Sequence, residues 1–163
     1  MKNEPVVKEL LDTLPQVGKV ATIMIRPARK EPPRKIQEVE VSEEKGLISD
    51  HFSSSYSKKR QITLIQKEHI EAVASMLGQE SIEPGLLRRN IIIEGINLLA
   101  LKDKQFKIGE AILEGTGICH PCSRMEENLG PGGYNAMRGH GGLTAKVITG
   151  GTLKVGDEVR VVE

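Results

Sequence analysis

Short apolar segments, each ended by glycine or proline, constrain the fold of this chain more than any other feature. Residues 18–26 have the pattern of a strand that is apolar on both faces, and Pro27 ends it. Residues 62–65 are β-rich, and residues 91–93 are an isoleucine run closed by Gly95. Such runs favour a single, mainly β barrel. We expect its strands around Val20, Ile36, Ile62, Ile91, Phe106, Leu143 and Val155.

Two segments show convincing helical spacing. Residues 4–14 place apolar side chains at i, i+3 and i+4 steps, and Pro15 follows them. Residues 67–77 repeat this spacing directly after the strand at 62–65 and stop at Gly78. The first segment predicts an amphipathic amino-terminal helix, and the second predicts a helix that continues from a strand.

The composition excludes several classes of protein. The 163 residues are 38% hydrophobic but only 2% aromatic, which indicates an aliphatic core and leaves no base-stacking platform. A formal net charge of +1 argues against a nucleic-acid partner. No apolar run approaches the roughly 18 residues of a membrane span. Two cysteines make no disulfide framework, so we expect a cytoplasmic protein with no membrane partner.

Both cysteines lie in one short motif, in which Cys119 and Cys122 enclose His120 and Pro121. A thiolate, not a thiol, is the nucleophile and the metal ligand, and nearby cationic groups favour it. His120 and Arg124 flank Cys122, and Pro121 stiffens the turn that carries it. Cys122 is therefore the candidate catalytic residue and the candidate metal ligand.

Three other interpretations of the motif remain open. The two cysteines can be small buried hydrophobes. A closed zinc site needs about four ligands, whereas His51, His69 and His140 are scattered without metal-site spacing. A thioredoxin-like dithiol should open a long helix, but the glycine-rich segment 130–133 interrupts the residues that follow.

Three further segments carry weaker signals. The glycine-rich stretch 130–142 lets a backbone approach a ligand closely and offers free amides to an anion. Residues 26–35, rich in proline and basic side chains, form either a solvated connection or an anion-facing lip. Residues 106–112 and 153–159 share a turn that feeds a strand, and the serine-rich residues 52–59 predict a mobile loop.

The order of several motifs along the chain resembles that of the MOSC domain, named for the carboxy-terminal part of molybdenum cofactor sulfurases. The residues that carry the resemblance are, in order, Gly46, Asp50, His51, Arg60, Gln61, Arg89, Asn90, Ile91, Pro121, Cys122, Arg138, Gly139, Gly150, Gly156 and Asp157. The resemblance covers about residues 20–162 and implies a mixed β-barrel with a few short helices. We therefore divide the chain into an amino-terminal helix and lead-in (1–17) and a MOSC-like barrel domain (18–163).

The resemblance also implies a cofactor, the molybdenum cofactor (molybdopterin), and a site. Cys122, not Cys119, matches the family's invariant cysteine, as a persulfide carrier or a molybdenum ligand. Arg60, Arg89 and Arg138 supply forks for a pterin phosphate, or else make ordinary surface ion pairs. For the remaining matched residues, Asn90 can read the pterin edge, whereas the pair at 50–51 can instead be structural.

These expectations leave two main functions and a weaker third. The first is a protein that handles the cofactor or its sulfur through Cys122, with a cysteine desulfurase or a molybdoenzyme as partner. The second is a small molybdenum-dependent oxidoreductase that reduces N-hydroxylated substrates, and the third is a metal-free dithiol protein. The chain shows no counterpart of the pyridoxal-phosphate desulfurase domain of the sulfurases, nor of the membrane anchor of the amidoxime-reducing relatives. We therefore expect a stand-alone family member.

Overall fold

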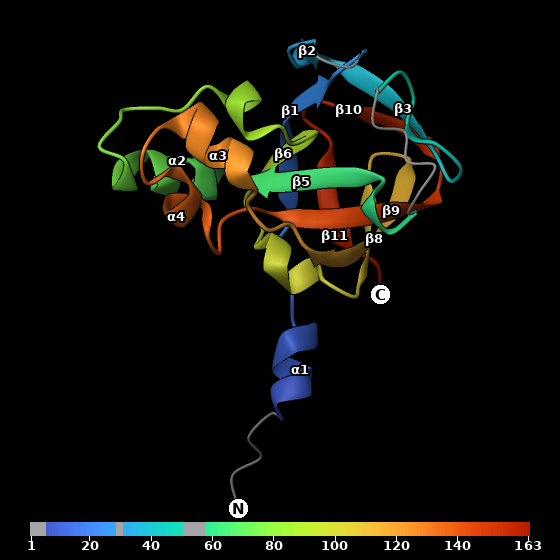
Figure 1. The fold of residues 1–163 in the computed structure, drawn as a ribbon. Coiled ribbons are helices and arrows are strands. Elements are labelled where there is room, and N and C mark those ends of the chain that lie inside the picture. Colours follow the sequence, from blue (N-terminus) through green and yellow to red (C-terminus); the bar gives the residue numbers. More distant parts are fainter. Residues whose placement is uncertain (1–5, 29–30, 51–57) are drawn as a thin grey trace, which may run out of the picture.

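The computed structural model describes residues 6–28, 31–50 and 58–163. Across these ranges the protein is mainly β, with a closed barrel of seven strands and four short helices outside it (Figure 1). The barrel strands are β1 (Gly18–Ile25), β5 (Ile62–Gln66), β6 (Ile91–Glu94), β7 (Gln105–Ile108), β8 (Ala111–Ile118), β9 (Leu143–Thr149) and β11 (Glu158–Val161). The mainly β barrel expected from the short apolar runs is confirmed.

The barrel closes because β1 pairs at both of its edges. The strands follow the order β11-β7-β8-β9-β5-β6-β1, and Gly18 of β1 pairs back with Val159 of β11. β5 and β6 are parallel, whereas the other neighbouring pairs in the ring are antiparallel. A parallel pair needs a long crossover, and α2 (Lys67–Met76) begins that connection directly after β5. The barrel is therefore mixed, as the resemblance implies.

A smaller sheet packs against the barrel. It consists of β3 (Glu38–Ser42), β4 (Gly46–Leu47) and β10 (Gly151–Lys154), while β2 (Arg34–Ile36) extends the barrel sheet beyond β1. Val39, Val41 and Leu153 alternate with exposed residues along their strands and belong to the same buried cluster as the barrel interior. One face of the small sheet therefore contributes to the main core.

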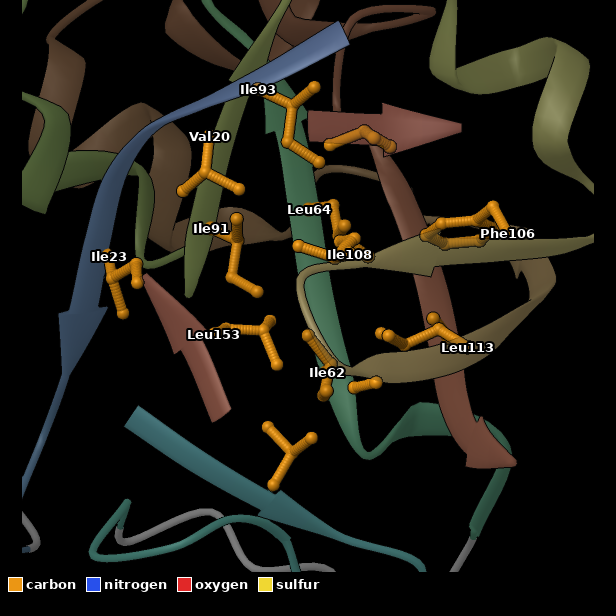
Figure 2. Close-up of a cluster of buried hydrophobic side chains, with 14 of the residues drawn as sticks. Val20, Ile23, Ile62, Leu64, Ile91, Ile93, Phe106, Ile108, Leu113 and Leu153 are labelled. Carbon is orange, nitrogen blue, oxygen red and sulfur yellow. The ribbon is translucent and has the colours of Figure 1, made fainter. Parts of the chain in front are cut away.

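The interior of the barrel is aliphatic. Figure 2 shows side chains such as Val20, Leu64 and Ile91 directed toward one another from different strands, with Phe106 as the aromatic member of the cluster. Burying one such side chain contributes about 1.5–3 kcal/mol, so this shared core is the main stabilising feature of the fold. The composition-based prediction of an aliphatic core agrees with this arrangement.

A second cluster lies outside the barrel, where three helices cover one side of it (Figure 1). α2, α3 (Ser123–Leu129) and α4 (Gly133–Met137) contribute side chains such as Val73, Met125 and Met137. Glu126 of α3 accepts backbone N–H groups of Tyr134 at 2.9 Å and of Gly132 at 3.0 Å. These two hydrogen bonds lower the pKa of the Glu126 carboxyl and fix the start of α4 to α3.

Several elements differ from the sequence-based expectation. The prediction of a strand at Val155 is wrong, because Val155 lies in the turn between β10 and β11. The run at 36–41 is divided into β2 and β3 at Gln37, and the short helix α4 was not expected. The serine-rich segment 52–59 falls almost entirely outside the described residues. These differences concern turns and short elements, where tertiary contacts outweigh local propensity.

The amino-terminal helix is shorter than expected and unburied. α1 (Val7–Asp12) extends away from the barrel in Figure 1, and none of its residues is buried. Asp12 forms an ion pair with Lys104 at 2.6 Å, which connects the end of α1 to the turn before β7. The apolar spacing predicted the helix correctly, but nothing among the described residues covers its apolar face. No helix of the described residues is long and apolar enough to cross a membrane.

Candidate functional site

A cavity of about 410 Å³ opens beside the end of β1, between the turn before β6 and the cysteine motif. Its volume lies in the range of small-molecule and cofactor sites. Of the residues singled out in the sequence, the structure brings five to the wall of this cavity: Asp50, Arg60, Arg89, Asn90 and Cys122. They come from four separate parts of the chain.

The cavity wall is strongly basic. Among the described residues, it contains five arginines, Arg26, Arg60, Arg88, Arg89 and Arg124, but only one carboxylate, that of Asp50. The whole chain carries a formal net charge of only +1, so positive charge is concentrated at this cavity. Such a concentration within low-dielectric walls favours an anionic ligand.

Arg89 is the most informative residue of the wall. It is only 7% exposed, its Nε donates to the carbonyl of Gly141 at 2.8 Å, and its Nη1 donates to Leu87 at 2.9 Å. Its Nη2 is buried and has no hydrogen-bond partner among the described residues. An unpaired buried donor is costly, so a ligand oxygen at this position would stabilise the arrangement.

Arg26 repeats this feature at another part of the wall. It follows β1, its Nε is buried, and this nitrogen also lacks a partner in the described part of the chain. Its backbone N–H donates to Asp50 Oδ1 at 2.8 Å, which fixes the buried carboxylate at the cavity wall. No motif in the sequence points to Arg26 itself, although one interpretation of the basic segment 26–35 is an anion-facing lip. Arg26 and Pro33 of that loop line the cavity.

Two more arginines of the wall were also not selected. Arg88 adjoins Arg89 and has a left-handed backbone with φ of 59° at the end of the 3₁₀ turn η2 (Pro84–Leu87). That conformation is uncommon for a residue with a side chain and reverses the chain before β6. Arg124 was noted only as a neighbour of Cys122. In the sequence, only the adjacency of Arg88 to Arg89, and the position of Arg124 close to Cys122, indicate that these two arginines belong to the site.

Asn90 holds two strands together at the cavity wall. Its backbone N–H donates to Thr63, and its side-chain Oδ1 accepts from the backbone and hydroxyl groups of Thr63, each at 3.1 Å. Its carbonyl accepts the N–H of Met24 at 2.7 Å. Asn90 therefore links β1 to β5, and only its amide nitrogen, 3.5 Å from the Met24 carbonyl, is weakly held.

The cysteine motif forms the turn between β8 and α3. Cys119 is buried, with 3% exposure, and its N–H donates to Gly142 at 2.8 Å. Cys122 is exposed at the first turn of α3, where its carbonyl accepts the N–H of Met125 at 2.9 Å. Both cysteines line the cavity, but only Cys122 is open to solvent.

The glycine-rich stretch packs against the backbone of this turn. A Cβ at Gly141 would overlap the carbonyl of Cys119, and a Cβ at Gly142 would overlap the carbonyl of Leu64. These two glycines therefore allow close approach of neighbouring backbone. Neither glycine lines the cavity.

Three of the expected cofactor-binding residues lie away from the cavity wall. Gln61 is buried, and its amide donates to Glu43 and accepts from Val147, both at 2.8 Å. Arg138 and Gly139 are exposed at the turn after α4. His51 lies outside the described residues. The structure thus gives Gln61 a role in joining strands and assigns no contact with the cavity to Arg138 or Gly139.

No group of three or more histidine, cysteine or acidic side chains suited to a metal ion occurs in the described ranges. The protein therefore offers one exposed thiol and an arginine-rich wall in place of a closed metal cage. These features define a small β-barrel protein with an arginine-lined cavity beside an exposed cysteine. A family model gives the particular family, because the MOSC domain matches residues 51–160. The chain belongs to the MOSC domain family, whose members are associated with the molybdenum cofactor.

Solved structures agree with this assignment at the level of the fold. The YuaD protein from Bacillus subtilis has a TM-score of 0.80 at 18% identity, over 91% of this chain and 98% of that chain. YiiM from Geobacillus stearothermophilus has a TM-score of 0.73 at 16% identity, over 90% of this chain and 75% of that chain. YiiM from Escherichia coli has a TM-score of 0.67 at 17% identity, over 89% and 70% of the two chains. No curated protein matches the sequence.

Proposed function

We propose that this protein binds the molybdenum cofactor in the arginine-lined cavity and uses Cys122 as its single reactive thiol. The observation that carries the proposal is a pair of buried donors, Arg26 Nε and Arg89 Nη2, which have no partner in the described part of the chain and belong to two residues that line the same cavity. Two unpaired guanidinium donors suit a phosphate group, which accepts through several oxygens.

The donor set fits the two ends of a molybdopterin molecule. Arg26 and Arg89 would hold its phosphate in the buried part of the cavity, and the soft thiol of Cys122 would meet its sulfur and metal end near solvent. The cofactor would supply a molybdenum centre for oxygen or sulfur transfer. The protein itself would orient it and present the thiol.

We favour a sulfur-handling role because Cys122 is exposed while Cys119 is buried. A cysteine desulfurase bearing a persulfide can reach Cys122. The Cys122 thiolate would attack the outer sulfur of that persulfide, forming a persulfide on Cys122 and releasing the thiolate of the donor. A molybdoenzyme or its cofactor would then receive the sulfur. Arg124, which carries a permanent positive charge, lines the same wall as Cys122.

The experiment is an analysis of protein purified from cells that make the molybdenum cofactor. Bound molybdenum and pterin are expected in near-equal amounts, and both should be reduced in an Arg26→Ala, Arg89→Ala double variant. Purified protein that contains neither, and that takes up no cofactor in vitro, would refute the proposal. Sulfane sulfur on Cys122, measured by cyanide release after incubation with a cysteine desulfurase, tests the sulfur-handling step separately.

A small molybdenum-dependent reductase is the second candidate. The same exposed position of Cys122 leaves the proposed metal end open to an N-hydroxylated substrate. Turnover of such a compound by cofactor-loaded protein with a chemical electron donor would favour this function. Sulfane sulfur loading without turnover would favour the first.

A further inference from the structure

Two histidines from different parts of the chain lie next to each other, and one of them belongs to the glycine-rich stretch. His69 lies in α2 and His140 follows α4, and their ring centroids are 5.1 Å apart with an interplanar angle of 81°. Both side chains are half-buried, so solvent still reaches them. Neither residue lines the cavity described above.

The hydrogen bonding of His140 defines which of its ring nitrogens is available. Nδ1 lies 3.1 Å from the carbonyl of Ala136, and because a carbonyl only accepts, Nδ1 must carry the proton. In the neutral ring, Nε2 then carries the lone pair. Metal-binding histidines are oriented in this way, with one ring nitrogen donating to a carbonyl and the other facing the ion.

The separation of the rings fits a shared ion. A zinc–nitrogen distance of about 2.0–2.1 Å and a tetrahedral angle place two imidazole centroids about 5 Å apart. We propose that His69 and His140 form a two-imidazole binding site for a divalent transition metal ion such as Zn²⁺. No third histidine, cysteine or acidic ligand joins them within the described residues, so water completes the coordination. Such a site exchanges its metal and differs from a closed structural zinc site.

The surroundings favour the neutral imidazole that a metal requires. Burial lowers the pKa of His69, and the neighbouring His140 lowers it further, while Glu68 acts in the opposite direction. The carboxylate of Glu68 accepts the backbone N–H of Gly95 at 2.9 Å and so is held by the turn after β6. Glu68 thus adds negative charge near the pair while bonded to that turn.

The site is connected to the cavity through the backbone. His140 precedes Gly141 and Gly142, whose carbonyls accept from Arg89 and from Cys119, each at 2.8 Å. An ion at the histidine pair would therefore restrain the segment that positions both residues. The metal site itself does not depend on the proposed cofactor function.

The test is a calorimetric titration of the full chain with zinc chloride. We expect one Zn²⁺ per chain with saturable binding, weakened at least about tenfold in His69→Ala and in His140→Ala. His120→Ala is the matched control, because this exposed histidine lies at the cysteine motif. A Cys119→Ser, Cys122→Ser variant should keep the zinc affinity, which separates the imidazole site from binding by thiols.

Zinc binding that persists in both histidine variants would overturn the proposal. Loss of zinc binding in the double cysteine variant, or no zinc binding by the parent protein at millimolar zinc, would also overturn it. If a histidine variant does not fold, imidazole ¹H–¹⁵N spectra of the unmodified protein decide. Zinc should then shift the ring signals of His69 and His140 and leave those of His120 in place. Shifts confined to His120 would equally overturn it.

Discussion

The guanidinium of Arg89 donates a 2.8 Å hydrogen bond to the carbonyl of Gly141, across 52 positions of sequence. This bond and a second one to Leu87 fix the side chain, so its remaining nitrogen, Nη2, stays buried without a partner among the described residues. A surface arginine would turn toward water, but Arg89 is buried and has no such freedom. The guanidinium is therefore held in place by the protein alone, as a preorganised binding group would be.

Replacing Arg89 should weaken binding of an anionic cofactor. A charge-assisted hydrogen bond to phosphate contributes about 1.5–3 kcal/mol, so Arg89→Ala should reduce cofactor affinity roughly ten- to a hundredfold. Arg89→Lys should recover little, because an ammonium lacks the planar fork. Titration with isolated molybdopterin, together with the Tm of each variant, measures the effect apart from any loss of folding.

Two other arginines serve as controls for this measurement. Arg160 is exposed and paired with Glu158, so Arg160→Ala should bind as the parent protein does. Arg138→Ala should also bind normally, since Arg138 is exposed and does not line the cavity. Unchanged affinity in Arg89→Ala at both low and physiological salt would remove Arg89 from the site.

The two cysteines should differ in function. Cys122→Ser should abolish sulfane sulfur loading and strongly reduce cofactor retention, because it removes the exposed thiol. Cys119→Ser should load sulfur normally but lose about 1–3 kcal/mol of stability, because it buries a hydroxyl in place of a thiol. Cyanide-releasable sulfur and chemical denaturation give the two readouts. Equal failure of both variants, in a protein that reduces disulfides without molybdenum, would instead support a dithiol function.

Two glycines of the same loop should tolerate substitution very differently. Gly139 and Gly142 both have left-handed backbones, with φ of 81° and 96°. A Cβ at Gly139 meets nothing within 4 Å, whereas a Cβ at Gly142 would overlap the Leu64 carbonyl. Gly139→Ala should therefore cost about 1–2 kcal/mol from backbone strain, and Gly142→Ala about 1–3 kcal/mol more. Urea denaturation of the two variants measures this difference directly, and equal costs would contradict the close approach.

Acidification should destabilise the fold through His69. Burial and the neighbouring His140 lower the pKa of His69 below its ordinary value of 6.5, so the unfolded chain binds a proton more readily than the folded one. Stability is therefore complete above the unfolded pKa and decreases as the pH falls through and below it. Between about pH 7.5 and 5.5, with a chelator present, the Tm should fall more for the parent protein than for His69→Gln. A His120→Gln control should behave like the parent, and an identical fall in His69→Gln would exclude this origin.

The sequence alone determined most of the barrel, because strands such as β1, β5 and β6 carry apolar residues on both faces and most of their residues are buried. It also determined the helix α2, whose spacing is regular. It did not determine the division of the last strand at Val155, because the turn there depends on β10 and β11 belonging to different sheets. It likewise did not determine α4. This helix begins at a glycine and depends on two backbone N–H groups that donate to the carboxylate of Glu126.

The candidate site shows the same limit more clearly. The sequence identified Arg89 and Cys122 from their motifs, and the structure brings them to one cavity. It could not separate Arg60 from Gln61, which adjoin in sequence, although one lines the cavity and the other bonds Val147 within the core. Nor could it select Arg26, whose importance depends on a buried nitrogen without a partner. Residue type and order fix which chemistry is available, but only the packed chain fixes which donors are left unpaired, because that depends on neighbours distant in sequence.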